Sequence, residues 1–303
     1  MKIILRIIFI VISIIIIGYG LICMVEYFAN RTSVNDIEAS STKVYSLEEY
    51  PKFDTSIETK DMADAFFKEF TGNSVSDINY TDNHNGYIKL IDGEIDLLIG
   101  TKPSEEELEY AKEKNIELEV IPIAKEGLVF FVNKNNSVDN LSLDEIGDIY
   151  SGEINNWREV NGKNARIKVF QKTDNSGFQS EILSLVMKEK ELLNKVKENS
   201  YENAEEILKN IANEDDGENS IGYSYYHSTV LFNKENEGVK VLTINGVEPN
   251  NETIKNGEYP ITTEYCAILR KNEPEDSNAS KIVREIESNR GQKIIEAAGY
   301  IVK

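Results

Sequence analysis

The sequence predicts an α/β fold with largely parallel sheets, and three observations lead to it. Short apolar runs typical of buried strands alternate with segments whose apolar residues repeat at helical spacing. The composition is globular, with 40% hydrophobic and 28% charged residues. A length of 303 residues is enough for two compact domains and a short appendage. In open α/β sheets ligands bind where strands end and helices begin, so functional residues are expected there.

The first half of the folded region is expected to hold two helices and three strands. The helices are predicted over 61–70 and 105–114, and the strands over 95–100, 118–124 and 128–133. The helical assignment of the first segment depends on Met62, Phe66 and Phe70, which fall on one side of a helix. The strand segments are almost uniformly apolar, which is typical of strands covered on both faces.

The second half continues the alternation of helices and strands. A short helix over 141–152 is expected to end at Gly152, because glycine commonly ends helices. Trp157 is expected in the core. The remaining elements, in chain order, are a strand over 166–172, helices over 177–196 and around 203–213, strands over 221–226, 239–244 and 264–270, and helices near 278–288 and 291–298.

The N-terminus is predicted to be a membrane anchor over residues 1–28. Lys2 and Arg6 precede an almost unbroken apolar run over 7–25, which is close to the roughly 20 residues that span a bilayer core. The two cations favour a cytoplasmic N-terminus, so the rest of the chain is expected outside the cytoplasm. Two alternatives remain open, namely lipidation at Cys23, where the preceding Ile22 is bulkier than such signals prefer, and cleavage elsewhere.

Composition excludes several classes of function for the region that follows. A polar linker over 29–46 is expected to lead to a solute-binding domain over 47–303. The formal net charge of −20 argues against nucleic acid as a partner, because binding to phosphate backbones needs an excess of Lys and Arg. With 2 cysteines and 2 histidines, the chain has neither a disulfide framework nor a histidine-rich metal centre. No metal and no cofactor are therefore predicted.

The segment QKTDNSGFQSE (171–181) joins a predicted strand to a predicted helix, and three interpretations of it remain open. Ser176 and Gln179 match a capping box, which needs no ligand. Free amides at a helix start, the close approach allowed by Gly177 and the charge of Lys172 would equally suit an anion. A nucleophilic Ser176 is the weakest interpretation, because the segment is not G-x-S-x-G and neither histidine is near it in sequence.

Two more polar helix starts and one strand end resemble this segment chemically. Thr59 precedes the first predicted helix, and Asn83 precedes a further short helical segment. Thr101 follows the strand at 95–100, and Ser104 after it is a candidate helix cap. Each is a normal cap taken alone. Together they predict convergence on one small anion.

Three long segments resemble the PstS-like phosphate-binding proteins, the extracytoplasmic receptors of phosphate ABC importers. The resemblance covers roughly residues 52–303, is most specific over 122–160, and is also visible over 243–262 and 291–301. It implies a type II periplasmic-binding-protein fold, in which two α/β lobes close over a ligand. The implied parts are lobe I over 47–126 and 262–303, lobe II over 127–261, and crossover strands near 126–133 and 259–266.

The resemblance also implies a set of ligand residues. By position these are Thr59, Asn83, Thr101, Lys172, Ser176, Gly177 and Phe178. Phe178 stands where the family usually has threonine, so one hydroxyl donor is absent. Lys172 stands where an arginine is frequent, which keeps the charge but not the bidentate geometry. Thr101 replaces an aspartate found in some members, and Asn83 replaces the common serine.

The expected function is therefore that of a membrane-tethered solute-binding protein, not an enzyme. It is expected to capture inorganic phosphate or a similar oxyanion outside the cell and to deliver it to an ABC permease. The altered ligand set keeps an alternative open, in which a degenerate binding-protein domain acts as a sensor or interaction module. A hydrolase using Ser176 would need a base beside it, and none is visible in the sequence.

Overall fold

A computed structural model describes residues 45–73, 79–172, 181–188, 190–192, 200–201, 204–213 and 217–303. The predicted anchor over 1–28, nearly all of the predicted linker over 29–46, and the predicted ligand residues Ser176, Gly177 and Phe178 lie outside these residues. Among the residues that are described, no helix combines the length and the apolar character needed to cross a membrane.

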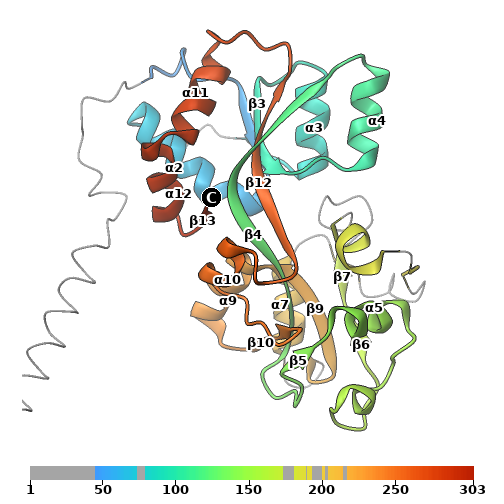
Figure 1. Cartoon of the computed structure of the whole chain (residues 1–303). Helices are drawn as coiled ribbons and strands as arrows, with labels where there is room; N and C mark the ends of the chain where they lie inside the picture. The colour runs from blue at the N-terminus through green and yellow to red at the C-terminus, as the bar shows by residue number, and fades with distance from the viewer. Residues whose placement is uncertain are drawn as a thin grey trace, which may run out of the picture. The chain divides into compact units, whose positions relative to one another are not determined.

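The central feature is a nine-stranded sheet (Figure 1). Its strand order is β2-β1-β3-β12-β4-β9-β6, and β10 and β13 also pair with β4. The strands are β1 (Phe53–Thr55), β2 (Asn79–Tyr80), β3 (Leu97–Thr101), β4 (Leu118–Asn133), β6 (Lys168–Val169), β9 (Ser220–Tyr225), β10 (Val239–Val241), β12 (Thr262–Arg270) and β13 (Ile301–Val302). Two small sheets pair β5 (Asn140–Leu141) with β11 (Thr243–Ile244) and β7 (Gln171–Lys172) with β8 (Ser200–Tyr201).

The sheet is mixed, so the prediction of largely parallel sheets is wrong at its centre. Strands β1, β2 and β3 are parallel to one another, as are β6 and β9. Strand β12 is antiparallel to both β3 and β4, and β4 is antiparallel to β9. Antiparallel strands need no helical crossover between them, but strands buried on both faces show the same apolar pattern in either direction. The pattern of apolar residues in the sequence therefore could not distinguish parallel from antiparallel strands.

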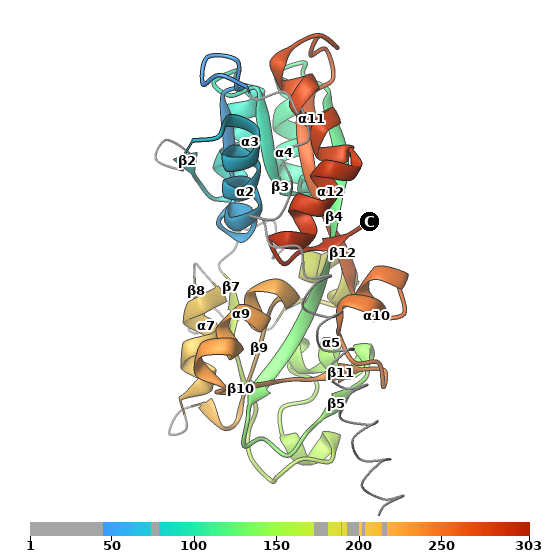
Figure 2. The same ribbon diagram turned by 90° about the vertical axis from the view of Figure 1, so that its left-hand side faces the viewer.

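Strand β4 is one continuous strand of 16 residues, whereas the sequence predicted two separate strands. Its residues 118–127 pair with β12, and β13 pairs with two of them, while residues 128–133 pair with β9 and β10. We call the first part of β4, with β1–β3, β12, β13 and the helices beside them, lobe I. The second part of β4, with β5–β11 and the helices beside them, is lobe II, and Figure 2 shows β4 running through both. Lys125, Glu126 and Gly127 interrupt the apolar pattern, but their backbone remains extended and paired with β12.

Lobe I is covered by helices on both faces of its strands. In Figure 1, α2, α11 and α12 lie on one side of the lobe I strands, and α3 and α4 lie on the other. Apolar side chains of α3, β3 and β12, among them Leu90, Leu98 and Ile268, form a fully buried cluster. The helices are α2 (Lys60–Thr71), α3 (Asn83–Ile91), α4 (Glu105–Glu113), α11 (Asn278–Glu287) and α12 (Asn289–Ala297), and all but α3 agree closely with predicted helices.

Lobe II carries its own core, centred on Phe131, Phe170 and Ile207. Trp157 is buried as predicted, and its Nε1–H donates to the Asn219 carbonyl at 2.9 Å. Among the described residues, the helices of this lobe are α5 (Leu143–Ser151), α7 (Ala204–Ala212), α9 (Tyr226–Asn236) and α10 (Asn251–Asn256).

Three lobe II predictions are wrong in extent. The predicted strand over 166–172 divides into β6 and β7, which belong to different sheets, and the one over 239–244 divides likewise into β10 and β11. The predicted helix over 177–196 is too long, because a π-helical turn at Leu183–Met187 is followed by Lys188 with a φ of +54°. A positive φ does not continue a right-handed helix. Apolar periodicity does not register such breaks.

A buried carboxylate fixes the start of lobe I. Asp54 in β1 is fully buried, and it accepts hydrogen bonds from the Thr55 amide at 2.8 Å and the Thr81 hydroxyl at 3.0 Å. The Lys89 ammonium of α3 donates to the same carboxylate at 2.7 Å. These three donors tie β1 to α3 and to the loop that precedes it. They therefore hold two of the predicted ligand segments together.

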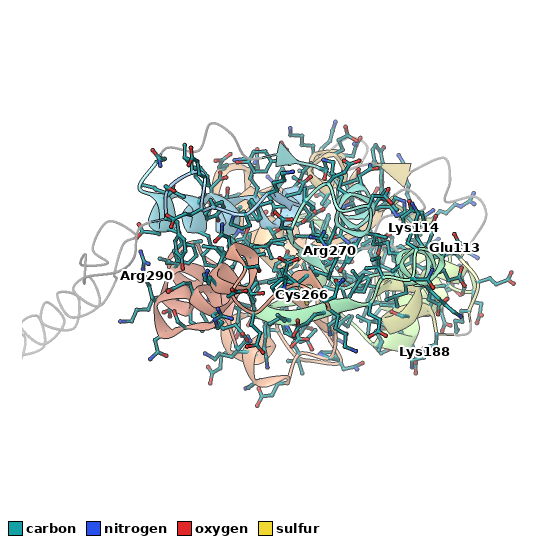
Figure 3. The ribbon with its side chains drawn as sticks, turned by 90° about the horizontal axis from the view of Figure 1, so that it is seen from above. Glu113, Lys114, Lys188, Cys266, Arg270 and Arg290 are labelled. Atoms are coloured by element: carbon teal, nitrogen blue, oxygen red, sulfur yellow. The ribbon has the colours of Figure 1, made fainter. Side chains whose placement is uncertain are left out.

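The substitution Asp54→Asn is expected to destabilise the protein, because it leaves Lys89 without its charged partner. A loss of about 2 kcal/mol would lower Tm by about 4–8 °C in thermal unfolding. The control is Asp92→Asn, whose carboxylate pairs with the exposed Lys114 at the edge of the molecule (Figure 3) and should shift Tm by less than about 1 °C. Equal shifts in the two variants would contradict the role given to Asp54.

Candidate functional site

Four of the predicted ligand residues lie in the described part of the chain, and each begins or ends a regular element. Thr59 ends a short 3-10 helix, η2 (Ile57–Thr59), directly after β1. Asn83 is the first residue of α3, Thr101 ends β3, and Lys172 ends β7. All four are more than nine-tenths buried, with exposed fractions of 0%, 8%, 3% and 4%. Burial of so many polar side chains requires partners for them.

Asn83 and Thr101 are joined by a hydrogen bond, and each side chain has one further buried polar atom. The Thr101 amide donates to Asn83 Oδ1 at 2.9 Å, which fixes the orientation of the Asn83 side chain. Within the described residues, Asn83 Nδ2 and Thr101 Oγ1 are buried and have no hydrogen-bond partner. A buried polar group left in this state costs about 1–3 kcal/mol. The pair therefore presents an amide donor and a hydroxyl that a ligand could satisfy.

The helix start at Asn83 differs from the prediction in register. Asn83 was expected before the helix, but α3 begins at Asn83, and Asp82 is the N-cap that accepts from the Asn85 amide. Aspartate is among the preferred N-cap residues, so the sequence contained this signal. Asn83 consequently lies in the first turn, where backbone amides and the helix dipole favour negative charge.

Gly100 makes the approach of Asn83 possible, and sequence reasoning missed it. A Cβ on Gly100 would lie 2.3 Å from Asn83 Oδ1, well inside van der Waals contact. Any larger residue at this position would push the Asn83 side chain away from the end of β3. The dipeptide Gly100-Thr101 at a strand end is the sequence signal that could have indicated a close approach.

Thr59 belongs to a network of hydroxyl groups beside this unit. Its Oγ1 lies 2.8 Å from Thr55 Oγ1 and 3.1 Å from Ser56 Oγ, and it donates to the Ile99 carbonyl at 3.1 Å. Thr55 and Ile99 are paired in the parallel register of β1 and β3. The network therefore places Thr59 next to the strand that ends at Thr101.

Lys172 reaches this region from lobe II through an ion pair that sequence reasoning missed. Its Nζ lies 2.9 Å from Glu58 Oε1, and the side chains are 5% and 22% exposed. Burial alone would raise the pKa of the Glu58 carboxyl, but the Lys172 ammonium outweighs it and holds that pKa below its usual value. The Lys172 amide also donates to the Tyr223 hydroxyl at 3.0 Å, which anchors β7 to β9. A local sequence pattern does not predict an ion-pair partner 114 residues away.

Two further carboxyls lie where the lobes join, that of the buried Glu126 and that of the half-buried Glu181. Glu126 of β4 accepts from the Gly127 amide at 2.8 Å, and burial raises the pKa of its carboxyl to about 7. Glu181 accepts from the Tyr225 hydroxyl at 3.0 Å and from the Thr263 hydroxyl, and burial likewise raises the pKa of its carboxyl to about 7. Thr263 is the β12 partner of Glu126 in the sheet register. Both carboxyls therefore lie beside the same pair of strands, β4 and β12.

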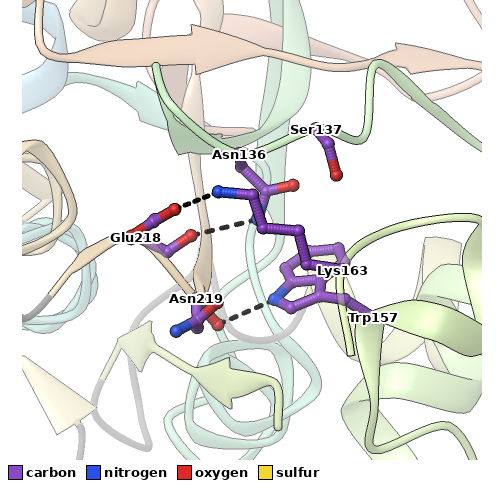
Figure 4. A pocket seen from close by; sticks show the side chains of 6 residues that line it. All are labelled: Asn136, Ser137, Trp157, Lys163, Glu218 and Asn219. Carbon is purple, nitrogen blue, oxygen red and sulfur yellow. Dashed lines mark hydrogen bonds and ion pairs between the residues drawn. The ribbon is translucent and has the colours of Figure 1, made fainter. Parts of the chain in front are cut away.

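A separate surface hollow in lobe II does not include these residues. Figure 4 shows its lining of Asn136, Ser137, Trp157, Lys163, Glu218 and Asn219. Its polar groups largely satisfy one another, since Lys163 pairs with the Glu218 carboxylate and Asn136 donates to the Glu218 carbonyl at 3.1 Å. This hollow therefore offers little unsatisfied chemistry. Among the described residues, no cluster of three or more His, Cys, Asp or Glu side chains is arranged to hold a metal ion.

Comparison with known proteins gives the family. A model described as the PBP superfamily domain matches residues 57–283. The chain belongs to the PBP superfamily. Its mixed α/β fold of two lobes is the one expected for that superfamily. The predicted relationship is therefore confirmed.

Curated relatives carry the name phosphate-binding protein PstS. The one from Staphylococcus haemolyticus is 28% identical over 222 residues, which is 71% of this chain and 68% of the relative. The one from Staphylococcus aureus is 28% identical over 224 residues, which is 71% of this chain and 66% of the relative. The chain thus spans about two thirds of the length of these relatives.

Solved structures of phosphate receptors have the same fold. A phosphate ABC transporter substrate-binding protein from Clostridium perfringens with bound phosphate has a TM-score of 0.67 at 24% identity, over 83% of this chain and 98% of that one. An ABC-type phosphate transport receptor from Vibrio cholerae has a TM-score of 0.64 at 18% identity, over 83% and 99%. At these identities the likeness establishes the fold alone.

Glu126 makes the stability of the protein depend on pH. The pKa of its carboxyl is about 7 in the folded protein, whereas a glutamate in an unfolded chain has a pKa of about 4.3. Because the folded pKa is the higher one, the folded state binds the proton more tightly. The stabilisation of the folded state by the protonated Glu126 carboxyl is complete below about pH 4. It declines as the pH rises and is lost above about pH 7.

The substitution Glu126→Gln is expected to remove most of this dependence, since the amide keeps an acceptor for the Gly127 amide but cannot ionise. At pH 8.5 it should raise Tm by several degrees, because a penalty of up to about 3 kcal/mol disappears, whereas at pH 5 the two proteins should melt within about 2 °C. Thermal unfolding by circular dichroism measures both, with the exposed Glu119→Gln on the same strand as control. The same difference in Tm at both pH values would contradict this account.

Proposed function

We propose that the protein is an extracytoplasmic solute-binding protein that captures phosphate or a similar oxyanion for an ABC importer. The observation that carries the proposal is a pair of buried atoms, Asn83 Nδ2 and Thr101 Oγ1, that have no partner among the described residues and lie at a helix start and a strand end. Both belong to residues that the resemblance to PstS-like proteins selected from sequence. The names of the curated relatives, and the phosphate bound in one protein of the same fold, support this choice of ligand.

The proposed site would combine neutral donors with one cation. Asn83 would donate its amide and Thr101 its hydroxyl, while Thr59 would contribute a hydroxyl from its network. Lys172 would supply positive charge from lobe II. Small oxyanions carry several acceptor oxygens, and helix starts with free amides suit them. Ser176, Gly177 and Phe178 are proposed to add backbone amides from the segment that follows Lys172.

Closure of the lobes would follow from this distribution of donors. Thr59, Asn83 and Thr101 belong to lobe I, whereas Lys172 belongs to lobe II. A ligand that contacts both lobes stabilises the arrangement that brings them together. The closed form is then proposed to dock on an ABC permease, with residues 1–28 as the membrane anchor. No covalent step and no cofactor are part of this proposal.

Isothermal titration of the full chain, purified in detergent, tests the proposal with phosphate, arsenate, sulfate and molybdate. We expect a dissociation constant in the micromolar range for phosphate or for one of the other oxyanions, which corresponds to about 8 kcal/mol. Absence of binding by all four up to millimolar concentration would reject oxyanion capture. The alternative of a sensor or interaction module without an oxyanion ligand would then take its place.

Two isosteric substitutions are expected to weaken binding without disturbing the fold. Thr101→Val removes the hydroxyl and should reduce affinity by about 10-fold, while Asn83→Asp keeps the acceptor for the Thr101 amide but turns the donor into a negative charge and should reduce it by about 100-fold or more. Thr71→Val is the matched control, because this buried hydroxyl donates to the Phe67 carbonyl at the far end of α2. Unchanged affinity in Asn83→Asp would place the ligand elsewhere.

A further inference from the structure

Glu58 is a negatively charged residue among the residues proposed to bind an anion. It immediately precedes Thr59, and its Oε1 lies 2.9 Å from the Lys172 ammonium. The Tyr300 hydroxyl donates to the Glu58 backbone carbonyl at 3.0 Å, so the C-terminal segment of lobe I helps to fix the position of Glu58. The side chain is 22% exposed, which leaves room for it to move. A fixed backbone and a partly accessible side chain suit a residue that can exchange partners.

We propose that Glu58 is an affinity- and specificity-determining residue, whose carboxylate acts as a built-in competitor for the anion at Lys172. This inference rests on the proposed function, because it presupposes that Lys172 contacts an oxyanion. The ammonium of lysine has three donor hydrogens, so a ligand either displaces Glu58 or binds beside it. In both cases a bound anion meets a carboxylate within a few ångströms, in surroundings shielded from water.

The charges of Lys172 and Glu58 set the charge balance of the site. Lys172 contributes one positive charge and Glu58 one negative charge, so the pair as a whole offers no net attraction to an anion. Glu58 remains ionised at neutral pH, since Lys172 holds the pKa of its carboxyl below the usual value. Repulsion by a neighbouring carboxylate grows with the charge of the ligand. The site is therefore biased toward singly charged oxyanions and against doubly charged ones.

A neighbouring carboxyl adds to this bias only at higher pH. Above about pH 7, where the Glu181 carboxyl is ionised, it lies close enough to Glu58 for the two to repel each other electrostatically, and Lys102 partly offsets this. Lys102 itself is paired with Glu264 at 2.8 Å, so its charge is also largely compensated. Selection would thus come from a repulsive element as well as from attractive contacts, which is a common way to obtain specificity.

The test compares Glu58→Gln with wild type, as full chains in detergent, by titration with phosphate and with sulfate at pH 6. At this pH phosphate is mainly a monoanion, whereas sulfate is a dianion. We expect Glu58→Gln to bind phosphate about 10-fold more tightly and to gain more affinity for sulfate than for phosphate. Glu58→Asp keeps the charge and should stay within about threefold of wild type for both ligands.

The control is Glu117→Gln, which changes the formal charge of the chain by the same amount but lies in an exposed pair with Lys271. It should leave both affinities unchanged. Binding by wild type with equal or weaker binding by Glu58→Gln would overturn the inference and leave the proposed function standing. An equal gain for phosphate and sulfate would overturn the specificity role. Absence of binding in wild type and in every variant would overturn both.

Discussion

The continuous strand β4 is the constraint on which the rest of the molecule depends. A strand of 16 residues is about 50 Å long, and its two parts pair with different sets of neighbours. Strand β12 runs beside its first part, so both lobes are connected through the same pair of strands. At the crossing, a Cβ on Gly127 would lie 2.7 Å from Ile254 Cδ1, which shows how closely α10 packs there. The carboxyls of Glu126 and Glu181 lie beside this crossing.

Buried polar groups at the candidate site differ in how far the protein itself satisfies them. Asp54 and Thr59 each have several partners within the protein. In the described part of the chain, Asn83 and Thr101 retain one unpaired atom each, and Lys172 is paired across the lobes with a residue that also lies beside Thr59. Ser224, His227 and Asn233 also carry a buried side-chain atom without a partner among the described residues, so such atoms alone do not locate a ligand site. The resemblance to PstS-like proteins is what selects Asn83 and Thr101 from among them.

The sequence predicted those parts of the fold that are encoded locally. Helix α4 was predicted with its cap at Ser104, and the structure contains both hydrogen bonds of a capping box there. The continuity of β4 was missed because Lys125 and Glu126 resemble a break in an apolar strand. Within the site, Thr59, Asn83, Thr101 and Lys172 were selected by resemblance, whereas Glu58 was not, because its partner is distant in the chain. Local sequence patterns do not predict pairing between distant residues. They also do not predict the close approach of a side chain, such as that of Asn83 to Gly100.

The route of the chain has a mechanical consequence. The chain enters lobe II along β4 and leaves it before β12, while the first described residues and the C-terminal β13 both belong to lobe I, since the Tyr45 amide donates to the Phe70 carbonyl of α2 and Ile301 pairs with Lys125. A pulling force applied between residue 45 and the C-terminus therefore acts first on lobe I. Lobe II would carry no tension until β12 separated from β3 and β4. Tension transmitted through the ends of this domain would thus leave the lobe that supplies Lys172 undisturbed.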